Sequence, residues 1–120
     1  MSQHKADIDR LYHMLAYARK AVQFNHRRNR DDLDADEMLA MATIHAIELI
    51  GEAIRTVSDD YQRRYPEIPW NLISGTRNRL IHGYMDIDLD IIWTIVTQDL
   101  PPLIKSLERV IRKEEGHVDV

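Results

Sequence analysis

The chain has 120 residues, 44% of them hydrophobic and 30% charged, and a formal net charge of −4 at pH 7. These numbers predict one globular domain over residues 1–120 and argue against a disordered chain or two separate cores. The absence of cysteine excludes disulfides and thiolate chemistry, and the negative charge excludes a protein that coats nucleic acid with its whole surface, although it allows a local basic groove.

The first predicted element is a helix from about Ala6 into the high twenties. Only four glycines and four prolines interrupt the chain, which favours helices over a sheet protein with its many turns. Within this stretch apolar side chains recur at alternating spacings of three and four, the pattern of a helix in a bundle. These residues are Ile8, Leu11, Leu15, Ala18 and Val22.

A basic run and an acidic run then follow one another. Residues 19–30 contain five bases and no acid, and residues 31–37 contain five acids and no base. Two interpretations stay open. The runs are either a solvated helix end followed by the acidic start of the next helix, or they form a patch in which Arg27, Arg28 and Arg30 contact phosphate.

A second long helix is predicted from a cap at Asp34 or Asp36 through about Val57. Its apolar residues form two lanes, which indicates burial against more than one neighbour. The lanes are Leu39, Ala42, Ala46, Leu49 and Ala53, and Ile47, Ile50, Ile54 and Val57. A short connection follows, with one helical turn expected around Tyr61 to Arg64.

A third helix is predicted from Pro69 to His82, because proline suits the first helical position and Gly83 suits the residue after the end. The acidic stretch at residues 86–90 then caps a last helix. Its expected core face is Ile92, Val96, Leu100, Leu103, Leu107 and Val110. Pro101 and Pro102 should kink or break this helix, which would resume at Pro102 or Leu103. We expect a polar, frayed tail at about 113–120, and an antiparallel bundle of four to five helices.

The stretch TRNRLIHGY, residues 76–84, places an arginine within an apolar stripe. Trp70, Ile73, Leu80 and Tyr84 share one face of the predicted third helix, and Arg77 falls among them. Arginine is almost never fully buried unless it is paired. The sequence therefore predicts a counter-ion, a solvent-filled cleft or a partner surface at Arg77.

The same stretch contains groups suited to phosphodiester chemistry. Asn78 and His82 are four residues apart, so the amide can orient the imidazole. A guanidinium neutralises charge on phosphate oxygens, and a histidine moves protons near neutral pH. Arg77 and His82 are five apart, about 140° around an ideal helix, so a long arm, a distorted last turn or a second subunit must bring them together. Spacing alone also fits an interfacial ion pair or a histidine at a helix C-terminus.

The run PWNLISGTRNRLIHGYMDIDLDIIWTIVTQDLPPL resembles the HepT-like toxins of the HEPN superfamily. Their motif is Arg, a polar residue, three further residues and His, with Tyr two places later. Arg77, Asn78, His82 and Tyr84 match these positions. The run IHAIELIGEAIRTVS is similar to the second long helix of that family, so the resemblance extends over more than half of the chain.

The resemblance implies an all-α, HEPN-like homodimer in which two copies of the motif face one cleft. It implies a toxin of a type VII toxin-antitoxin pair, acting as an endoribonuclease that cleaves RNA without metal or cofactor. Arg77 and His82 would be catalytic, and Asn78 would support them. An MNT-type nucleotidyltransferase antitoxin would silence the toxin by transferring AMP to Tyr84.

Arg27, Arg28, Arg30 and Arg79 are then candidate RNA contacts. The alternative is a non-catalytic helical binding subunit of a nucleotidyltransferase complex, in which Arg77 and His82 only hold an interface. The first residues lack a signal-peptide core, and no apolar run approaches the roughly 18 residues of a membrane helix, so we expect no membrane partner and a cytoplasmic location.

Other candidate sites are weaker. His45, Glu48 and Glu52 have a spacing conceivable for metal ligands, but carboxylate bundles need a repeated set on several helices, so pairing of a glutamate with an arginine such as Arg55 is favoured. Aromatic residues could stack on bases. These are Tyr61, Tyr65, Trp70 and Trp93, and for the two tryptophans core packing is favoured.

Overall fold

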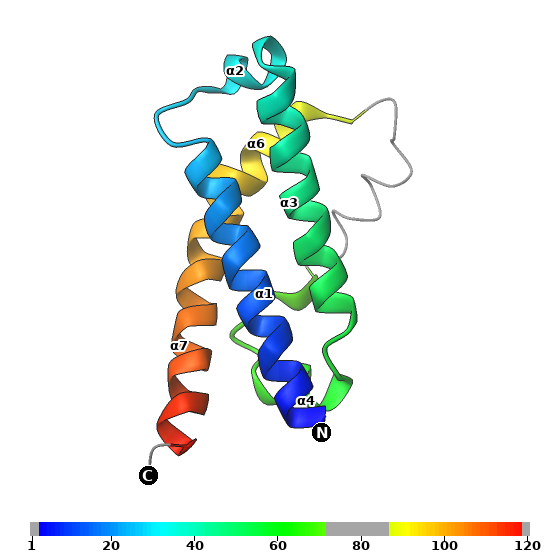
Figure 1. Cartoon of the computed structure of the whole chain (residues 1–120), viewed down its shortest axis with the longest axis vertical. Coiled ribbons are helices and arrows are strands. Elements are labelled where there is room, and N and C mark those ends of the chain that lie inside the picture. Colours follow the sequence, from blue (N-terminus) through cyan, green and yellow to red (C-terminus); the bar gives the residue numbers. More distant parts are fainter. Residues whose placement is uncertain (1–2, 72–86, 119–120) are drawn as a thin grey trace.

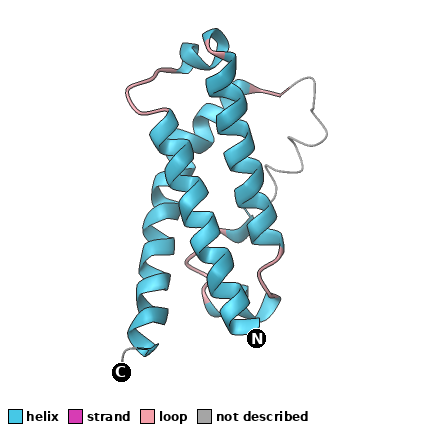
Figure 2. Cartoon of the chain, in the orientation of Figure 1, coloured by secondary structure: helices cyan, strands magenta, loops and turns pink. Residues whose placement is uncertain are grey.

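The computed structural model describes residues 3–71 and 87–118, and all structural statements refer to these ranges. Every regular element in them is helical, without a β-strand (Figure 2), which confirms the predicted all-α class. The long helices are α1 (Gln3–Phe24), α3 (Glu37–Arg55) and α7 (Leu100–Val118) (Figure 1). The short elements are α2 (Arg30–Ala35), α4 (Asp59–Arg64), α6 (Leu89–Thr94) and the π-helical turn η1 (Ile95–Asp99).

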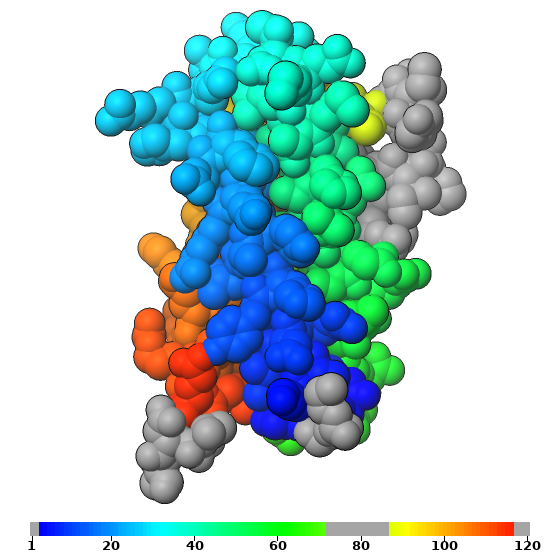
Figure 3. Space-filling model, viewed as in Figure 1, coloured from blue at the N-terminus to red at the C-terminus, as the bar shows by residue number. Residues whose placement is uncertain are grey.

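Helix α1 is the centre of the bundle and packs against both α3 and α7. It runs in the opposite direction to these two helices (Figure 1). In the space-filling view α1 lies along the front of the molecule, between α3 and α7 (Figure 3). The buried apolar side chains form one cluster that all three helices share, with Leu11, Ile47 and Leu107 completely inaccessible. The predicted helical bundle is confirmed.

Helix α1 ends at Phe24, earlier than predicted. Asn25 is 6% exposed, and its Nδ2 donates to the carbonyl of Ala21 at 2.8 Å and to Oγ1 of Thr43 at 3.0 Å. The hydrogen bond to Thr43 links the chain to α3 at the position where α1 would otherwise continue. Arg27 then adopts a left-handed φ of 62°, which a helix does not accommodate.

The connection to α3 contains a short helix that the sequence analysis did not anticipate. Asn29 and Asp32 form a capping box at the start of α2, because each side chain accepts a hydrogen bond from the other's backbone N–H. Of the two predicted caps, Asp34 and Asp36, it is Asp36 that caps α3, accepting from the backbone N–H of Leu39 at 3.1 Å. The turn expected at residues 61–64 is also confirmed, as α4, with Ser58 as its cap.

The two apolar lanes of α3 are buried with one clear exception. Ala42 is exposed, so its assignment to the core was wrong, and Leu49 is only partly buried. Ala40 and Thr43 are buried instead. The hydroxyl of Thr43 accepts a hydrogen bond from Asn25, the residue that follows α1, so the buried face of α3 includes Thr43 in place of Ala42.

The two prolines disturb the last helix in a different way from the one predicted. The backbone N–H of Leu100 bonds to the carbonyl of Ile95, five residues back, which is the π-helical spacing of η1. Pro101 and Pro102 then fall in the first turn of α7, directly after η1, so the two residues without a backbone N–H lie where the helical hydrogen-bond spacing changes. The wider turn accommodates the prolines upstream, so the α-helix resumes at Leu100 and not at Pro102 or Leu103.

The prediction of a frayed tail from Lys113 was wrong. Helix α7 continues to Val118, and Glu114 is only 5% exposed. The predicted core face of this last helix is confirmed, since all six of its residues are buried. No helix in the described ranges is both long and apolar enough to cross a membrane.

Candidate functional site

The motif residues Arg77, Asn78, Arg79, His82 and Tyr84 lie outside the described residues, as does most of the predicted helix from Pro69 to His82. The structure does describe the residues that flank this segment on each side. They are Trp70 and Asn71, which are helical, on the upstream side, and Ile87 and Asp88 on the downstream side.

Trp70 anchors the upstream end. Its side chain is buried, and the indole N–H donates to the carbonyls of Tyr65 at 3.0 Å and Gln62 at 3.1 Å. The prediction that Trp70 packs in the core is therefore confirmed, and Trp93 is partly buried against the same core. An open groove of about 480 Å³ lies beside this anchor, lined by Asp59, Gln62, Arg63, Pro66, Ile68, Pro69, Trp70 and Asn71.

A buried carboxylate holds the chain just before Trp70. Glu114 of α7 accepts hydrogen bonds from the hydroxyls of Tyr61, at 3.1 Å, and Tyr65, and its other oxygen lies 3.0 Å from Nε2 of His4. Tyr61 and Tyr65 are 3% and 8% exposed, so the suggestion that they stack on bases was wrong. Burial, followed by the hydrogen bond to Glu114, raises the pKa of Tyr65 to about 12, and burial also raises the pKa of Tyr61 far above its usual value.

We expect this cluster to make the protein sensitive to alkali. A hydroxyl whose pKa is higher in the folded state stabilises that state fully below its unfolded pKa, near 10, and the contribution disappears as pH rises towards 12. The free energy of unfolding, measured by urea titration between these pH values, should fall less steeply in Tyr65→Phe than in the unmodified protein. Equal slopes would show that Tyr65 does not contribute.

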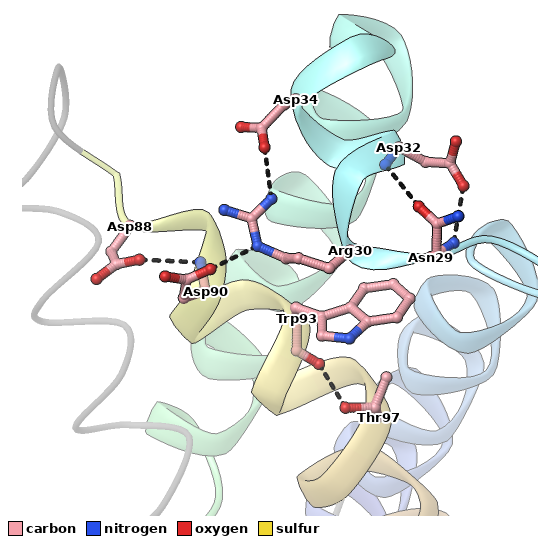
Figure 4. Close-up of polar contacts among 8 residues, drawn as sticks. All are labelled: Asn29, Arg30, Asp32, Asp34, Asp88, Asp90, Trp93 and Thr97. Atoms are coloured by element: carbon pink, nitrogen blue, oxygen red, sulfur yellow. Dashed lines mark hydrogen bonds and ion pairs between the residues drawn. The ribbon is translucent and has the colours of Figure 1, made fainter.

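At the downstream end, Asp88 caps α6 by accepting from the backbone N–H of Asp90 at 2.9 Å. Arg30 bridges α2 to this first turn, with Nε 2.6 Å from Oδ1 of Asp90 and Nη1 2.9 Å from Oδ2 of Asp34 (Figure 4). The hydrogen bond to Asp90 raises the pKa of the Arg30 guanidinium.

The basic run is thus partly neutralised by the acidic run that follows it. Arg28 lies 3.4 Å from Asp36, and Arg30 has two carboxylate partners. Arg27 is exposed and has no ion-pair partner among residues 3–71 and 87–118. This arrangement fits the interpretation of solvated helix ends for Arg28 and Arg30, and leaves Arg27 as the most available of the three candidate arginines.

Within the same ranges, no group of three histidine or acidic side chains is arranged to hold a metal ion. Glu52 forms an ion pair with Arg55, as the sequence analysis favoured. His45 and Glu48 are exposed on α3.

Sequence reasoning missed two buried carboxylates, which both contact the residues in and around α4. Asp7, 2% exposed, accepts from the backbone N–H of Ser58 at 2.9 Å and from its hydroxyl at 2.8 Å. A signal for both was present. Asp7 lies four residues before Leu11, and Glu114 lies four after Val110, so each extends the apolar stripe of its helix by one turn.

Comparison with known proteins identifies the family. The family model described as "Ribonuclease HepT-like" matches residues 14–110. The chain is 34% identical over 106 residues to "Putative RNase MJ0127" of Methanocaldococcus jannaschii, covering 88% of each chain. It is 36% identical over 100 residues to "Putative RNase MJ1380" of the same organism, covering 83% of this chain and 92% of the relative.

A third relative is "Probable ribonuclease HepT" of Thermococcus cleftensis, 36% identical over 80 residues, covering 67% of this chain and 73% of the relative. No solved structure matches the chain. The family match spans α3, the segment that carries the Arg77 to Tyr84 motif, and most of α7. The chain belongs to the HepT-like ribonuclease family.

Proposed function

We propose that this chain is the toxin of a toxin-antitoxin pair and cuts RNA as a metal-independent endoribonuclease. Arg77 and His82 are the catalytic residues, and Asn78 orients the imidazole or binds phosphate. The chain acts as a homodimer in which two copies of the motif line one cleft, in the cytoplasm. The observation that carries the proposal is that the complete pattern Arg77, Asn78, His82 and Tyr84 lies inside residues 14–110, which match a ribonuclease family.

The chemistry follows from the groups in the motif. One imidazole accepts the proton of a ribose 2′-hydroxyl, whose oxygen attacks the adjacent phosphorus. The bond from phosphorus to the 5′-oxygen then breaks, and the leaving oxygen takes a proton from the second imidazole, giving a 2′,3′-cyclic phosphate. Arg77 stabilises the charge that develops on the phosphate oxygens. One histidine cannot be acid and base at the same moment, so this step favours a site shared by two subunits.

The described framework supports this proposal through rigid anchors on both sides of the motif. Upstream, the buried Trp70 indole is held by two carbonyls, and downstream Asp88 caps α6. Catalytic groups must be held in productive geometry by the elements around them, and these contacts fix the chain at Trp70 and at Asp88, on either side of the motif segment.

Substrate contacts outside the motif are assigned to arginines. Arg27 is exposed and unpaired within the described ranges, so we place it first, together with Arg79 of the motif segment. Arg28 contributes if phosphate displaces its 3.4 Å contact with Asp36. Arg30, named with them from the basic run, already pairs with two carboxylates, so we do not count it among the RNA contacts.

The direct test uses one oligonucleotide in two forms and an excess of chelator. We expect the protein to cut the RNA form and to leave unchanged the form with a single 2′-deoxy residue at the cleavage position, because the attacking hydroxyl is then missing. Gel analysis and mass spectrometry of the products should show a 2′,3′-cyclic phosphate. Loss of cleavage in chelator, or equal cleavage of the deoxy form, would contradict the mechanism.

We propose that regulation acts on Tyr84, two residues from His82. An MNT-type nucleotidyltransferase would transfer AMP from ATP to the phenol oxygen and release pyrophosphate. The added group is bulky and anionic, so its volume and its charge both oppose an incoming RNA phosphate. After incubation with the partner and ATP, mass spectrometry should find AMP on Tyr84. If AMP is found on another residue, or if Tyr84→Phe is still neutralised completely, Tyr84 is not the target.

A further inference from the structure

Arg30 occupies a joint between two helices that are far apart in the chain. It is the first residue of α2, and the Asn29 and Asp32 capping box fixes the backbone there. Its guanidinium uses Nε for Asp90 and Nη1 for Asp34 (Figure 4). The Arg30 side chain is only 29% exposed, less than either of its carboxylate partners.

The joint matters because of where α6 lies in the chain. Asp90 is in the first turn of α6, and only two residues separate this helix from segment 72–86, which carries the proposed catalytic motif. Helix α2 contacts α6, and within residues 3–71 and 87–118 the ion pair from Arg30 to Asp90 is the only one that links the two helices. The ion pair therefore holds the first turn of the helix that comes next in the chain after residues 72–86.

We propose that Arg30 is a positioning residue for the nuclease: its ion pair with Asp90 holds the N-terminus of α6 and so fixes the exit of the catalytic segment. The inference rests on the proposed function, because it takes residues 77–82 as the reacting groups. It also gives Arg30 a role that does not require contact with RNA.

The exposure of the partners sets the size of the effect. Asp90 is 78% exposed, and an ion pair in contact with water shifts an equilibrium by no more than about fivefold. We therefore expect loss of the pair to change the folding equilibrium by no more than this factor and to lower kcat by about three- to fivefold. The KM for RNA should stay constant, because no substrate contact is lost.

The test is a charge reversal measured by RNA cleavage kinetics. Arg30→Gln and Asp90→Asn should each lower kcat to a similar extent, and the double variant should be no worse than either single one. The reversed pair Arg30→Glu with Asp90→Arg, built on Asp34→Asn so that no third carboxylate repels the new glutamate, should recover most of the activity. Asp34→Asn alone is the matched control and should keep the kcat of the unmodified protein, since its partner pair lies within α2.

If Arg30 instead contacts RNA directly, the same variants should give different kinetic results. In that case Arg30→Gln raises KM, the defect depends on salt, and the charge reversal deepens it because an acid then faces the substrate. Those results, or unchanged kcat and KM in Arg30→Gln, would overturn the positioning role.

Hydrogen exchange provides a readout that does not depend on activity. The amides of Ile91 and Ile92 bond to the carbonyl of Asp88 at 3.1 and 3.3 Å in the first turn of α6. They should exchange faster in Arg30→Gln than in Asp34→Asn. Equal rates would show that the ion pair of Arg30 with Asp90 does not hold the first turn of α6. A protein that cuts no RNA even without substitution would refute the proposed function, whereas these exchange rates would still decide whether Arg30 holds α6.

Discussion

His82→Ala is expected to lower the rate of RNA cleavage by about a thousandfold. The substitution removes the group that moves protons, and in a shared cleft it removes both the acid and the base at once. The remaining arginine still binds the phosphate, so affinity for a non-cleavable RNA should change little. Initial cleavage rates in chelator, together with fluorescence anisotropy of a labelled 2′-deoxy analogue, measure the two quantities separately.

Two comparisons make the His82 result specific. Light scattering should show the same oligomer for His82→Ala and the unmodified protein, and His45→Ala, which changes an exposed histidine on α3, should cut RNA normally. If His82→Ala still cleaves RNA at the original rate, His82 is not a catalytic residue. If instead the unmodified protein fails to cut and His82→Ala dissociates the oligomer, the alternative of a non-catalytic binding subunit is correct.

Glu114→Ala is expected to lower the free energy of unfolding by about 3 kcal/mol, because it removes the acceptor for two buried tyrosine hydroxyls. For a domain of this size the thermal midpoint should fall by roughly 10 °C. Truncation after Lys113 removes the same carboxylate and should destabilise the protein at least as much. Thermal unfolding followed by circular dichroism gives both values.

The matched control for Glu114 is its neighbour. Glu115 is exposed, so Glu115→Ala should leave the thermal midpoint within a degree or so of the original. Glu114→Gln keeps one oxygen acceptor, so its thermal midpoint should lie between those of Glu114→Ala and Glu115→Ala. A thermal midpoint that does not change in Glu114→Ala would show that the last turns of α7 do not stabilise the protein through Glu114.

Much of the fold could be predicted because helix periodicity and caps are local properties. The apolar spacing located α1, α3 and the last helix, and Asp36 was found as a cap from its place before an apolar run. Tertiary contacts decided the details that were missed. The end of α1 depends on Asn25 reaching Thr43, and the exposure of Ala42 depends on which face of α3 meets α1.

The largest error in the fold came from applying polarity as a rule for exposure. Glu114 and Asp7 both continue apolar stripes, yet Glu114 was assigned to a polar tail and Asp7 was not considered for the core, since carboxylates are seldom buried without partners. The partners come from elsewhere in the chain, Tyr61 and Tyr65 for Glu114 and Ser58 for Asp7. A polar residue at a stripe position can therefore indicate a buried hydrogen-bonded site.

The site itself was predicted from a motif and a resemblance, and the family is now established while the residue roles remain proposals. The described residues added what the sequence could not provide. Arg28 and Arg30 were candidates for RNA because bases cluster at residues 27–30, but ion pairing depends on which carboxylates the fold brings near. Of these arginines only Arg27 remains without such a partner in the described ranges.

The most direct measurement is a crystal structure of the protein bound to an RNA with a single 2′-deoxy residue at its cleavage position. We predict that the guanidinium of Arg77 and the imidazole of His82 contact the same phosphate, with the motif of a second subunit completing the cleft. Side chains of Arg77 and His82 on opposite surfaces, with no second subunit bringing them to one phosphate, would contradict the nuclease mechanism.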